Sequence, residues 1–564
     1  MSAIDWIVLG CTILFIVVYG IYKSRGSKNI DGYLLGDRSL PWYNVGLSVM
    51  ATQASAITFL SAPGLAYADG MRFVQFYFGL PIAMIILCIT FVPIYHKLKV
   101  YTAYEFLEHR FDVKTRALTA SLFLIQRGLS TGITIYAPSI ILSTILNIDT
   151  TYTTLFIGSV VIIYTVFGGT KAVSYTQMLQ MSIIFCGLFL AGFVVVSMLP
   201  ASVGFTKALN IASKMGKMNV IDWHFDMNNR YTIWSGVIGG LFLQLSYFGT
   251  DQSQVGRYLT GSSVGQSRMG LLMNAMLKIP MQFLILLIGI LVFSFYQYQK
   301  PPIFFNSYEL NKIQKSSYSE EFKLKEAEFN VAFEEKKLKV IALDKALTKN
   351  ENVAATSSAV KAANQKLQDK RTEALAIMKK NDAKADTDDT NYVFLRFVTQ
   401  YLPKGLIGLL IAIVCMASMG STASALNSLA STTSVDIYKR FINKGGSELN
   451  YLNISKLATL FWGILSIGMA LYASKLGNLL EAVNILGSLF YGTILGVFLV
   501  AFYFKRIGGK AVFYSAIISE IIIFIAFKYD WMAYLWLNVF GCALVISFGL
   551  LIQQFIPAKT VKQV

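Results

Sequence analysis

Two polar stretches stand in apolar surroundings, and their residue types suit the binding of an alkali cation. Residues 48–64, "SVMATQASAITFLSAPG", combine small and hydroxyl side chains with a Pro-Gly pair. Residues 417–440 are rich in Ser and Thr, and small or hydroxyl residues recur at helical spacing, on one face. That face carries Ala417, Ser421, Ser424 and Ser428. Such a row offers the neutral oxygen ligands that Na⁺ needs, or else each hydroxyl bonds back to its own helix.

An interrupted helix would explain the first stretch. Within hydrocarbon every backbone amide must be satisfied, so an unwound segment is tolerated only where it lines a cavity or packs inside protein. The break exposes carbonyl oxygens and helix ends that bind ions and substrates. Small residues such as Ala51, Ala54 and Ala56 would let the backbone approach an ion. Close packing of helices through small residues is the alternative explanation.

Four ionisable residues lie within or at the ends of apolar segments. Arg127 and Lys278 are costly there and are expected to face a cavity or a partner. Asp251 and Arg257 are expected to form a gate pair or a helix-end ion pair. The histidines and cysteines show no catalytic or metal-ligand spacing, so an enzyme is not predicted.

The elements that hold these residues are transmembrane helices. The 564-residue chain is 55% hydrophobic, and apolar runs long enough to cross a bilayer recur along it. We predict about 13 spans in an all-α membrane protein, with boundaries good to a few residues. The predicted spans are 5–22, 43–67, 73–95, 116–146, 152–168, 174–198, 232–256, 270–297, 404–436, 454–474, 477–504, 511–527 and 533–554.

The distribution of basic residues predicts the orientation. Lys and Arg gather in alternate short connections and in the C-terminal tail, which predicts an outside N-terminus and a cytoplasmic C-terminus in a multi-pass cell (inner) membrane protein. The net charge of +18 therefore reflects topology. Because it is divided among short loops, no nucleic-acid partner is expected, and the lipid bilayer is the expected surrounding.

Residues 300–391 interrupt the apolar pattern. They are rich in Ala, Glu, Lys and Leu, and they predict two helices that fold back on each other. The parity of the spans places this insertion outside the cell. It is expected to be a solvated helical hairpin or a site for a protein partner, with a lid that captures substrate as the alternative.

Several motifs together resemble the sodium/solute symporter family, which includes sodium/glucose, proline, multivitamin, monocarboxylate and iodide transporters. The resemblance covers spans 2 to 11. It is carried by "LLGDRSLPWYNVGLSVMATQASA", "FVPIYHKLKVYTAYEFLEHRF", "YTVFGGTKAVSYTQMLQ", "SYFGTDQSQVGRYLTG" and "LNSLASTTSVDIYKR". "YTAYEFLEHRF" and "IYAPSIIL" look most like the multivitamin, monocarboxylate and iodide branch.

The resemblance implies the inverted-repeat (5+5) fold of the bacterial leucine transporter, with spans 2 and 7 as broken helices. The expected divisions follow the chain. They are 1–42, the first span and a cytoplasmic loop; 43–199, the first repeat; 200–299, an external loop and the start of the second repeat; 300–391, the insertion; 392–506, the rest of the second repeat; and 507–564, two C-terminal spans and the tail.

The resemblance also implies the sodium ligands. They are the carbonyls of Ala51, Ala54 and Ala417 and the hydroxyl of Ser421, with Gly420 where the family usually has a second hydroxyl residue. Members that carry an additional Na⁺ have Asp where this chain has Gln177, and Ala423 also replaces a hydroxyl residue. A neutral amide cannot balance a second cation, so one coupled Na⁺ is predicted.

Positions that align with the family's substrate pocket complete the implied site. They are Gln53, Thr58, Phe76, Tyr77, Gln244, Lys278 and Asn484, with Tyr247 as the gate beneath the substrate. We therefore predict Na⁺-coupled symport of a small polar solute by alternating access. A small organic anion such as a monocarboxylate is favoured over a sugar, because two cations lie within spans. A proton-coupled carrier on this fold and a transporter-like sensor are the alternatives.

Overall fold

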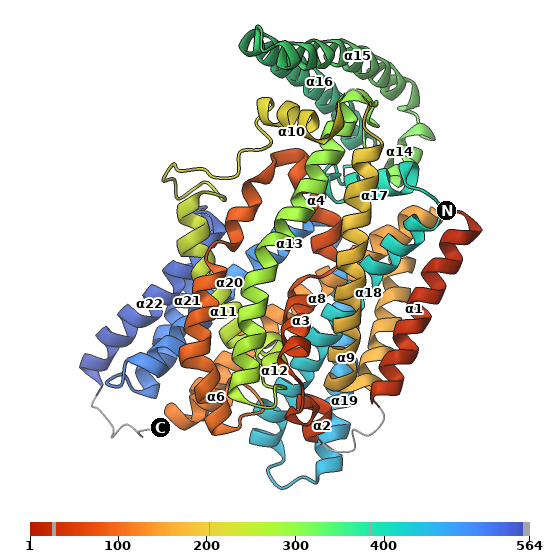
Figure 1. The fold of residues 1–564 in the computed structure, drawn as a ribbon. Coiled ribbons are helices and arrows are strands. Elements are labelled where there is room, and N and C mark those ends of the chain that lie inside the picture. The colour runs from red at the N-terminus through yellow and green to blue at the C-terminus, as the bar shows by residue number, and fades with distance from the viewer. Residues whose placement is uncertain (25–29, 202, 384, 557–564) are drawn as a thin grey trace.

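The computed structural model describes residues 1–24, 30–201, 203–383 and 385–556. Over these ranges the chain is helical, and its long helices form a bundle with two more helices above one end (Figure 1). Four basic residues used to predict the orientation lie outside the described residues; they are Arg25, Lys28, Lys559 and Lys562.

Helices occupy all 13 predicted spans. They are α1 (Ala3–Ser24), α3 (Trp42–Gln53) with α4 (Ala56–Asp69), the stretch Met71–Leu98, α8 (Val113–Leu146), α9 (Thr150–Ser197), η4 (Ser235–Gly239) with α11 (Gly240–Thr250) and α12 (Gln252–Tyr258), α13 (Val264–Tyr298), α18 (Leu406–Ser431) with η5 (Thr432–Ile442), α19 (Glu448–Ala470), α20 (Leu479–Tyr503), α21 (Gly509–Lys528) and α22 (Tyr534–Phe555).

Fewer helices are long and apolar enough to cross a membrane by themselves. Within the described ranges there are 9, or 10 when α3 and α4 count as one span. The difference from 13 arises where spans are short or broken. α9 is helical over 48 residues, and it includes a shorter apolar stretch, Thr150–Ile163, and a stretch long enough to cross a membrane, Val173–Ser197. It therefore contains two predicted spans, 152–168 and 174–198, but the helical backbone continues where a loop was expected.

Both predicted broken helices are present. α3 and α4 meet at 58° across Ala54 and Ser55. The second break lies between α11 and α12 at Asp251, whose backbone is extended (φ −78°, ψ 117°). The Asp251 side chain accepts a hydrogen bond from the amide of Ser253, 2.9 Å away, and so caps α12.

The insertion forms the predicted hairpin. α15 (Ser319–Lys349) and α16 (Val353–Asn381) pack along each other after the short α14 (Ser307–Gln314), and they share a small apolar core. Asn350 and Asn352 take left-handed backbone conformations, with φ of 55° and 52°, that allow the tight turn. Figure 1 shows the pair at the end of the bundle toward which α1 begins.

Elements that join the hairpin to the bundle come from distant parts of the chain. α10 (Gly204–Lys214) contacts α15, and α17 (Thr390–Tyr401) packs against α4. α13 contacts α3, α4 and α15, so one long helix reaches from the hairpin past the break in α3–α4. The hairpin is therefore attached to the broken helix that carries the first polar stretch.

Candidate functional site: a broken helix and a polar cavity

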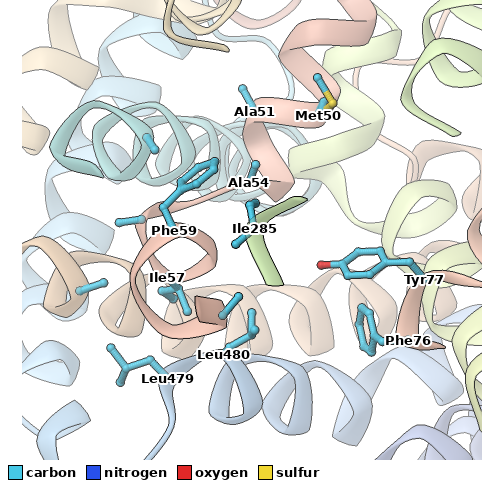
Figure 2. Close-up of a cluster of buried hydrophobic side chains, with 14 of the residues drawn as sticks. Met50, Ala51, Ala54, Ile57, Phe59, Phe76, Tyr77, Ile285, Leu479 and Leu480 are labelled. Atoms are coloured by element: carbon cyan, nitrogen blue, oxygen red, sulfur yellow. The ribbon is translucent and has the colours of Figure 1, made fainter. Parts of the chain in front are cut away.

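The end of α3 carries the carbonyl oxygens predicted to bind Na⁺. In a continuous helix the amide of Ser55 would donate to Ala51, but here it donates to the carbonyl of Gln53 at 3.1 Å. The backbone of Ala54 leaves the helical region (φ −85°, ψ 73°). The Ala51 carbonyl therefore does not accept the hydrogen bond that the Ser55 amide would donate in a continuous helix. Figure 2 shows Ala51 and Ala54 on one side of the break and Ile57 on the other.

α18 faces this break with its row of hydroxyls. The Thr52 and Ser424 hydroxyl oxygens are 3.2 Å apart, which joins α3 to α18 beside Ala51. The Ser421 hydroxyl donates to the carbonyl of Ser418 on its own helix at 3.1 Å. A hydroxyl that donates its hydrogen in this way keeps oxygen lone pairs for a cation. Ala417 and Gly420 lie on the same buried part of α18.

Gln177 connects three helices at this level. Its Nε2 donates to the carbonyl of Gly420 at 3.0 Å and to the Thr52 hydroxyl at 3.2 Å, and its Oε1 accepts from Ser48 at 2.6 Å. A Cβ built on Gly420 would lie 2.7 Å from Oε1 of Gln180. A hydroxyl side chain at position 420 would therefore meet the amides that α9 places there.

A cavity of about 70 Å³ lies beside the break and brings six predicted residues together. The six are Gln53, Thr58, Phe76, Tyr77, Asn484 and the predicted gate Tyr247. The volume is well below the roughly 300 Å³ at which ligand pockets usually begin, so the cavity is nearly closed in this conformation. Phe76 and Tyr77 pack edge to face with centroids 4.8 Å apart.

The two remaining predicted residues, Gln244 and Lys278, lie next to this cavity rather than on its wall. Gln53 donates to Oε1 of Gln244 at 3.2 Å across the interface of α3 and α11. Lys278 on α13 is fully buried, and its Nζ lies 5.4 Å from the ring centre of Tyr77. Among the described residues, no hydrogen-bond partner reaches this ammonium.

The expected pairing of Asp251 with Arg257 is wrong. Asp251 pairs with Arg127 of α8, and the Tyr491 hydroxyl donates to the same carboxylate at 2.9 Å. Arg257 instead contacts the carbonyl of Thr170 at 3.4 Å. The break at Asp251 turns its side chain toward α8, which could not be predicted from the spacing of Asp251 and Arg257 along one helix.

Arg127 and Tyr491 line the same cavity and connect this ion pair to the predicted gate. The Arg127 Cζ lies 5.4 Å from the ring centre of Tyr247, and the Tyr247 hydroxyl accepts from Gln254 at 2.8 Å. Tyr247 of α11 therefore bonds across the break to α12 and also contacts the ion-paired Arg127 of α8.

Two members of a buried polar row on α13, the neighbours of Lys278, were missed in the sequence. Asn274, Lys278 and Gln282 follow each other at intervals of four, so they lie on one helical face. All three are fully buried, and the amide atoms of Asn274 and Gln282 have no partner among the described residues. The signal was present, because three polar residues at helical spacing interrupt an apolar segment.

A second ion pair lies close to the cavity in the sequence of α20. Arg230 pairs with Glu481 of α20 at 2.6 Å, and the Tyr231 hydroxyl donates to the same carboxylate at 3.0 Å. These residues line a separate cavity of about 260 Å³ that also includes Phe73. The residue before Glu481, Leu480, lines the cavity beside the broken helix.

Comparisons with known proteins agree with this architecture. The chain is 28% identical over 501 residues to the sodium-coupled monocarboxylate transporter 1 of Xenopus laevis, covering 88% of this chain and 67% of the relative. It is 26% identical over 534 residues to the sodium/glucose cotransporter of Vibrio parahaemolyticus, covering 92% and 84%. It is 25% identical over 567 residues to the sodium/sialic acid symporter SiaT of Proteus mirabilis, covering 99% and 96%.

A solved structure shows the same fold. A Na⁺-coupled sialic acid symporter in a substrate-bound, outward-open state superposes with a TM-score of 0.77 at 22% sequence identity, and each chain is covered completely. This confirms the expected inverted-repeat, leucine-transporter-like architecture. The model of the family described as "Sodium:solute symporter family" matches residues 33–304 and 371–519, which leaves out most of the hairpin. Because the match spans most of the chain, this protein belongs to the sodium:solute symporter family and is a multi-pass membrane protein that couples solute transport to Na⁺.

Proposed function

We propose that the solute is a small organic anion, with a monocarboxylate favoured over a sugar. The observation that carries this proposal is the buried ammonium of Lys278, which no described residue neutralises and which contacts Tyr77 at the cavity wall. An uncompensated charge away from water is costly, and a solute carboxylate would remove that cost. The likeness to a sodium-coupled monocarboxylate transporter supports the same choice.

Arg127 is not the solute's charge partner in this proposal. It lines the cavity, but Asp251 already neutralises it. Gln53, Thr58 and Asn484 supply amide and hydroxyl groups for the polar part of the solute, and Phe76 and Tyr77 supply apolar surface. A mixed wall of this kind suits a carboxylate with a short carbon chain.

We propose that one Na⁺ binds between α3 and α18. Its ligands would be the carbonyls of Ala51, Ala54 and Ala417 and the hydroxyl of Ser421. Gln177, the residue that replaces a family carboxylate, is neutral, and its amide already has three partners. Support for a single ion therefore comes from the absence of a negative charge on this side chain.

In the proposed cycle, Na⁺ fixes the end of α3 and with it Gln53, whose side chain bonds to Gln244. Solute then enters past Arg230 and Glu481, and the bundle rocks until Tyr247 releases both toward the cytoplasm. The N-terminus and the hairpin lie outside in this orientation. One Na⁺ and one monocarboxylate carry no net charge, whereas one Na⁺ with a neutral sugar carries a charge worth about 2.3 kcal/mol per 100 mV.

Uptake into proteoliposomes tests this proposal. We expect labelled propionate to enter with an inward Na⁺ gradient, at a rate that an imposed membrane potential does not change. Lys278→Met should lower propionate uptake about tenfold or more, because the solute loses its charge partner. Lys510→Met, on an exposed residue at the start of α21, is the control. Potential-dependent glucose uptake, with no propionate uptake, would contradict the choice of an anion.

A further inference from the structure

A second cavity lies where the hairpin meets the bundle. Its volume is about 270 Å³, and it is enclosed by residues of α4, α13, α15, α16 and α17 together with Lys217. The walls combine aromatic rings with charged groups. The residues that carry the argument are Phe293, Phe305, Lys217, Lys336, Arg371 and Asp389. The cavity is distinct from the one beside the broken helix and shares no lining residue with it.

Two of the three cations in this cavity are already compensated. Arg371 pairs with Asp389 at 2.5 Å and also donates to the carbonyl of Ile303 at 3.0 Å. Lys217 donates to the carbonyl of Ala68, and the carboxylate of Asp69 contributes a favourable charge. Neither group therefore requires an additional anion.

Lys336 is different. Lys336 on α15 is 2% exposed and lines the cavity, and burial is the one influence on the pKa of its ammonium, with no hydrogen-bond or ion-pair partner found among the described residues. Its Nζ lies 5.2 Å from the ring centre of Phe333, one turn earlier on the same helix. Several other lysines of the hairpin have carboxylate partners; Lys325, Lys366 and Lys370 pair with glutamates between α15 and α16. Lys336 thus lies at the cavity and takes no part in the Lys–Glu pairs between α15 and α16.

We propose that this cavity binds a small carboxylate anion, with the Lys336 ammonium as its charge partner and the aromatic walls around its carbon chain. A buried unpaired charge is destabilising, and an anion of suitable size would compensate it. The volume is slightly below the usual range for ligand pockets, so the ligand must be small. Asn364 and Gln368 of α16 add neutral hydrogen-bonding groups to the same wall.

The site does not depend on which solute crosses the central cavity. It uses the hairpin, most of which lies outside the ranges matched by the family model. Burial lowers the pKa of Lys336 to about 7. Lys217, Arg371 and Asp389 are the other charged groups that line the cavity. A bound carboxylate favours the protonated lysine, so anion binding above pH 7 should take up a proton, and affinity should fall as the pH rises.

Calorimetric titration of the full chain in Na⁺-free potassium buffer tests the site, with propionate as the probe. We expect one site per chain, and a heat at pH 8 that changes between buffers of different ionisation enthalpy because a proton is taken up. Lys336→Gln should weaken binding about tenfold or more, as expected when a charge-assisted hydrogen bond is lost. Lys336→Met is a second neutral variant, and thermal melting verifies that both fold. Lys339→Gln, on an exposed residue of α15, is the control.

Two results would overturn the proposal. One is propionate binding of equal strength in the protein and in both Lys336 variants, which would place the anion elsewhere. The other is chloride binding as tight as propionate binding, or no propionate binding at all, which would exclude a carboxylate site in this cavity. Na⁺-driven uptake through the central cavity is measured separately, so its failure would leave these results unchanged.

Discussion

The side-chain amide of Gln177 donates a 3.0 Å hydrogen bond to the main-chain carbonyl of Gly420. They are two of the three positions at which this chain departs from the expected sodium-site residues, and they lie in contact. A larger residue at 420 would collide with the amides of α9, since a Cβ there would lie 2.7 Å from Gln180. The glycine at 420 and the glutamine at 177 therefore depend on each other structurally.

Gln177→Asp should alter the number of coupled ions. The aspartate would no longer donate to the Gly420 carbonyl, and its negative charge beside that oxygen would favour a second cation. We expect the Na⁺ to solute ratio in proteoliposomes to rise from one to two, and uptake to become dependent on membrane potential. Gln177→Asn, which stays neutral, is the control. An unchanged ratio in the aspartate variant would count against this account of stoichiometry.

Ser421→Ala tests the principal sodium site. Removing one neutral ligand should cost about 1 kcal/mol, so the half-saturating Na⁺ concentration should rise roughly five- to tenfold with little change in solute preference. Ser431→Ala removes a hydroxyl that bonds to Ser428 within the same helix and should leave Na⁺ dependence unaltered. If Ser421→Ala retained the Na⁺ dependence of the unmodified chain, this hydroxyl would not be a ligand.

The free energy of unfolding should fall more when one partner of the Arg127–Asp251 pair is replaced than when both are replaced. Asp251→Asn leaves the buried guanidinium without its charge partner, which typically costs about 3–5 kcal/mol of folding free energy. Arg127→Met combined with Asp251→Leu removes both charges and should recover much of that loss. Thermal melting in nanodiscs compares the single and the double variant with the unmodified chain. Equal destabilisation by the single and double replacements would show that the pair does not act as a unit.

Asp386 should make stability depend on pH at the base of the hairpin. Burial, together with the nearby carboxylates of Asp388, Asp389 and Glu309, raises the pKa of Asp386 to about 6. The folded state therefore favours the protonated acid, and this group should destabilise the fold progressively as the pH rises from about 4 to above 6.

Asp386→Asn should accordingly raise the melting temperature at pH 7.5 and have little effect at pH 4.5. The amide oxygen can still accept the hydrogen bond that the Asp388 backbone donates at 2.9 Å. Asp369→Asn, on an exposed residue of α16, is the control. A similar effect of Asp386→Asn at both pH values would contradict the raised pKa.

Much of the fold follows from local patterns in the sequence. Apolar length predicts each span, and the Ala-rich, Glu- and Lys-rich composition of residues 300–391 predicts the hairpin. The break after Gln53 was expected because small and hydroxyl residues replace large apolar ones there. These features depend on neighbours along the chain, so a single sequence contains them.

Pairings between distant segments could not be predicted in the same way. Asp251 lies six residues from Arg257 but pairs with Arg127, because the extended backbone at 251 turns the carboxylate toward α8. Lys336 resembles the other lysines of a solvated helix, and only the packing of α15 against the bundle buries it. Such roles depend on tertiary contacts that spacing does not encode.

α4 spans the distance between the two cavities. Its first turn supplies Ile57 and Thr58 to the cavity beside the break, and its last turns supply Tyr67 and Ala68 to the cavity beneath the hairpin. Since the bend at Ala54 separates α4 from α3, a change in the tilt of α4 would alter both cavities at once. An anion bound beneath the hairpin would therefore oppose such a tilt and slow the transport cycle, and transport would speed up again when the anion dissociates.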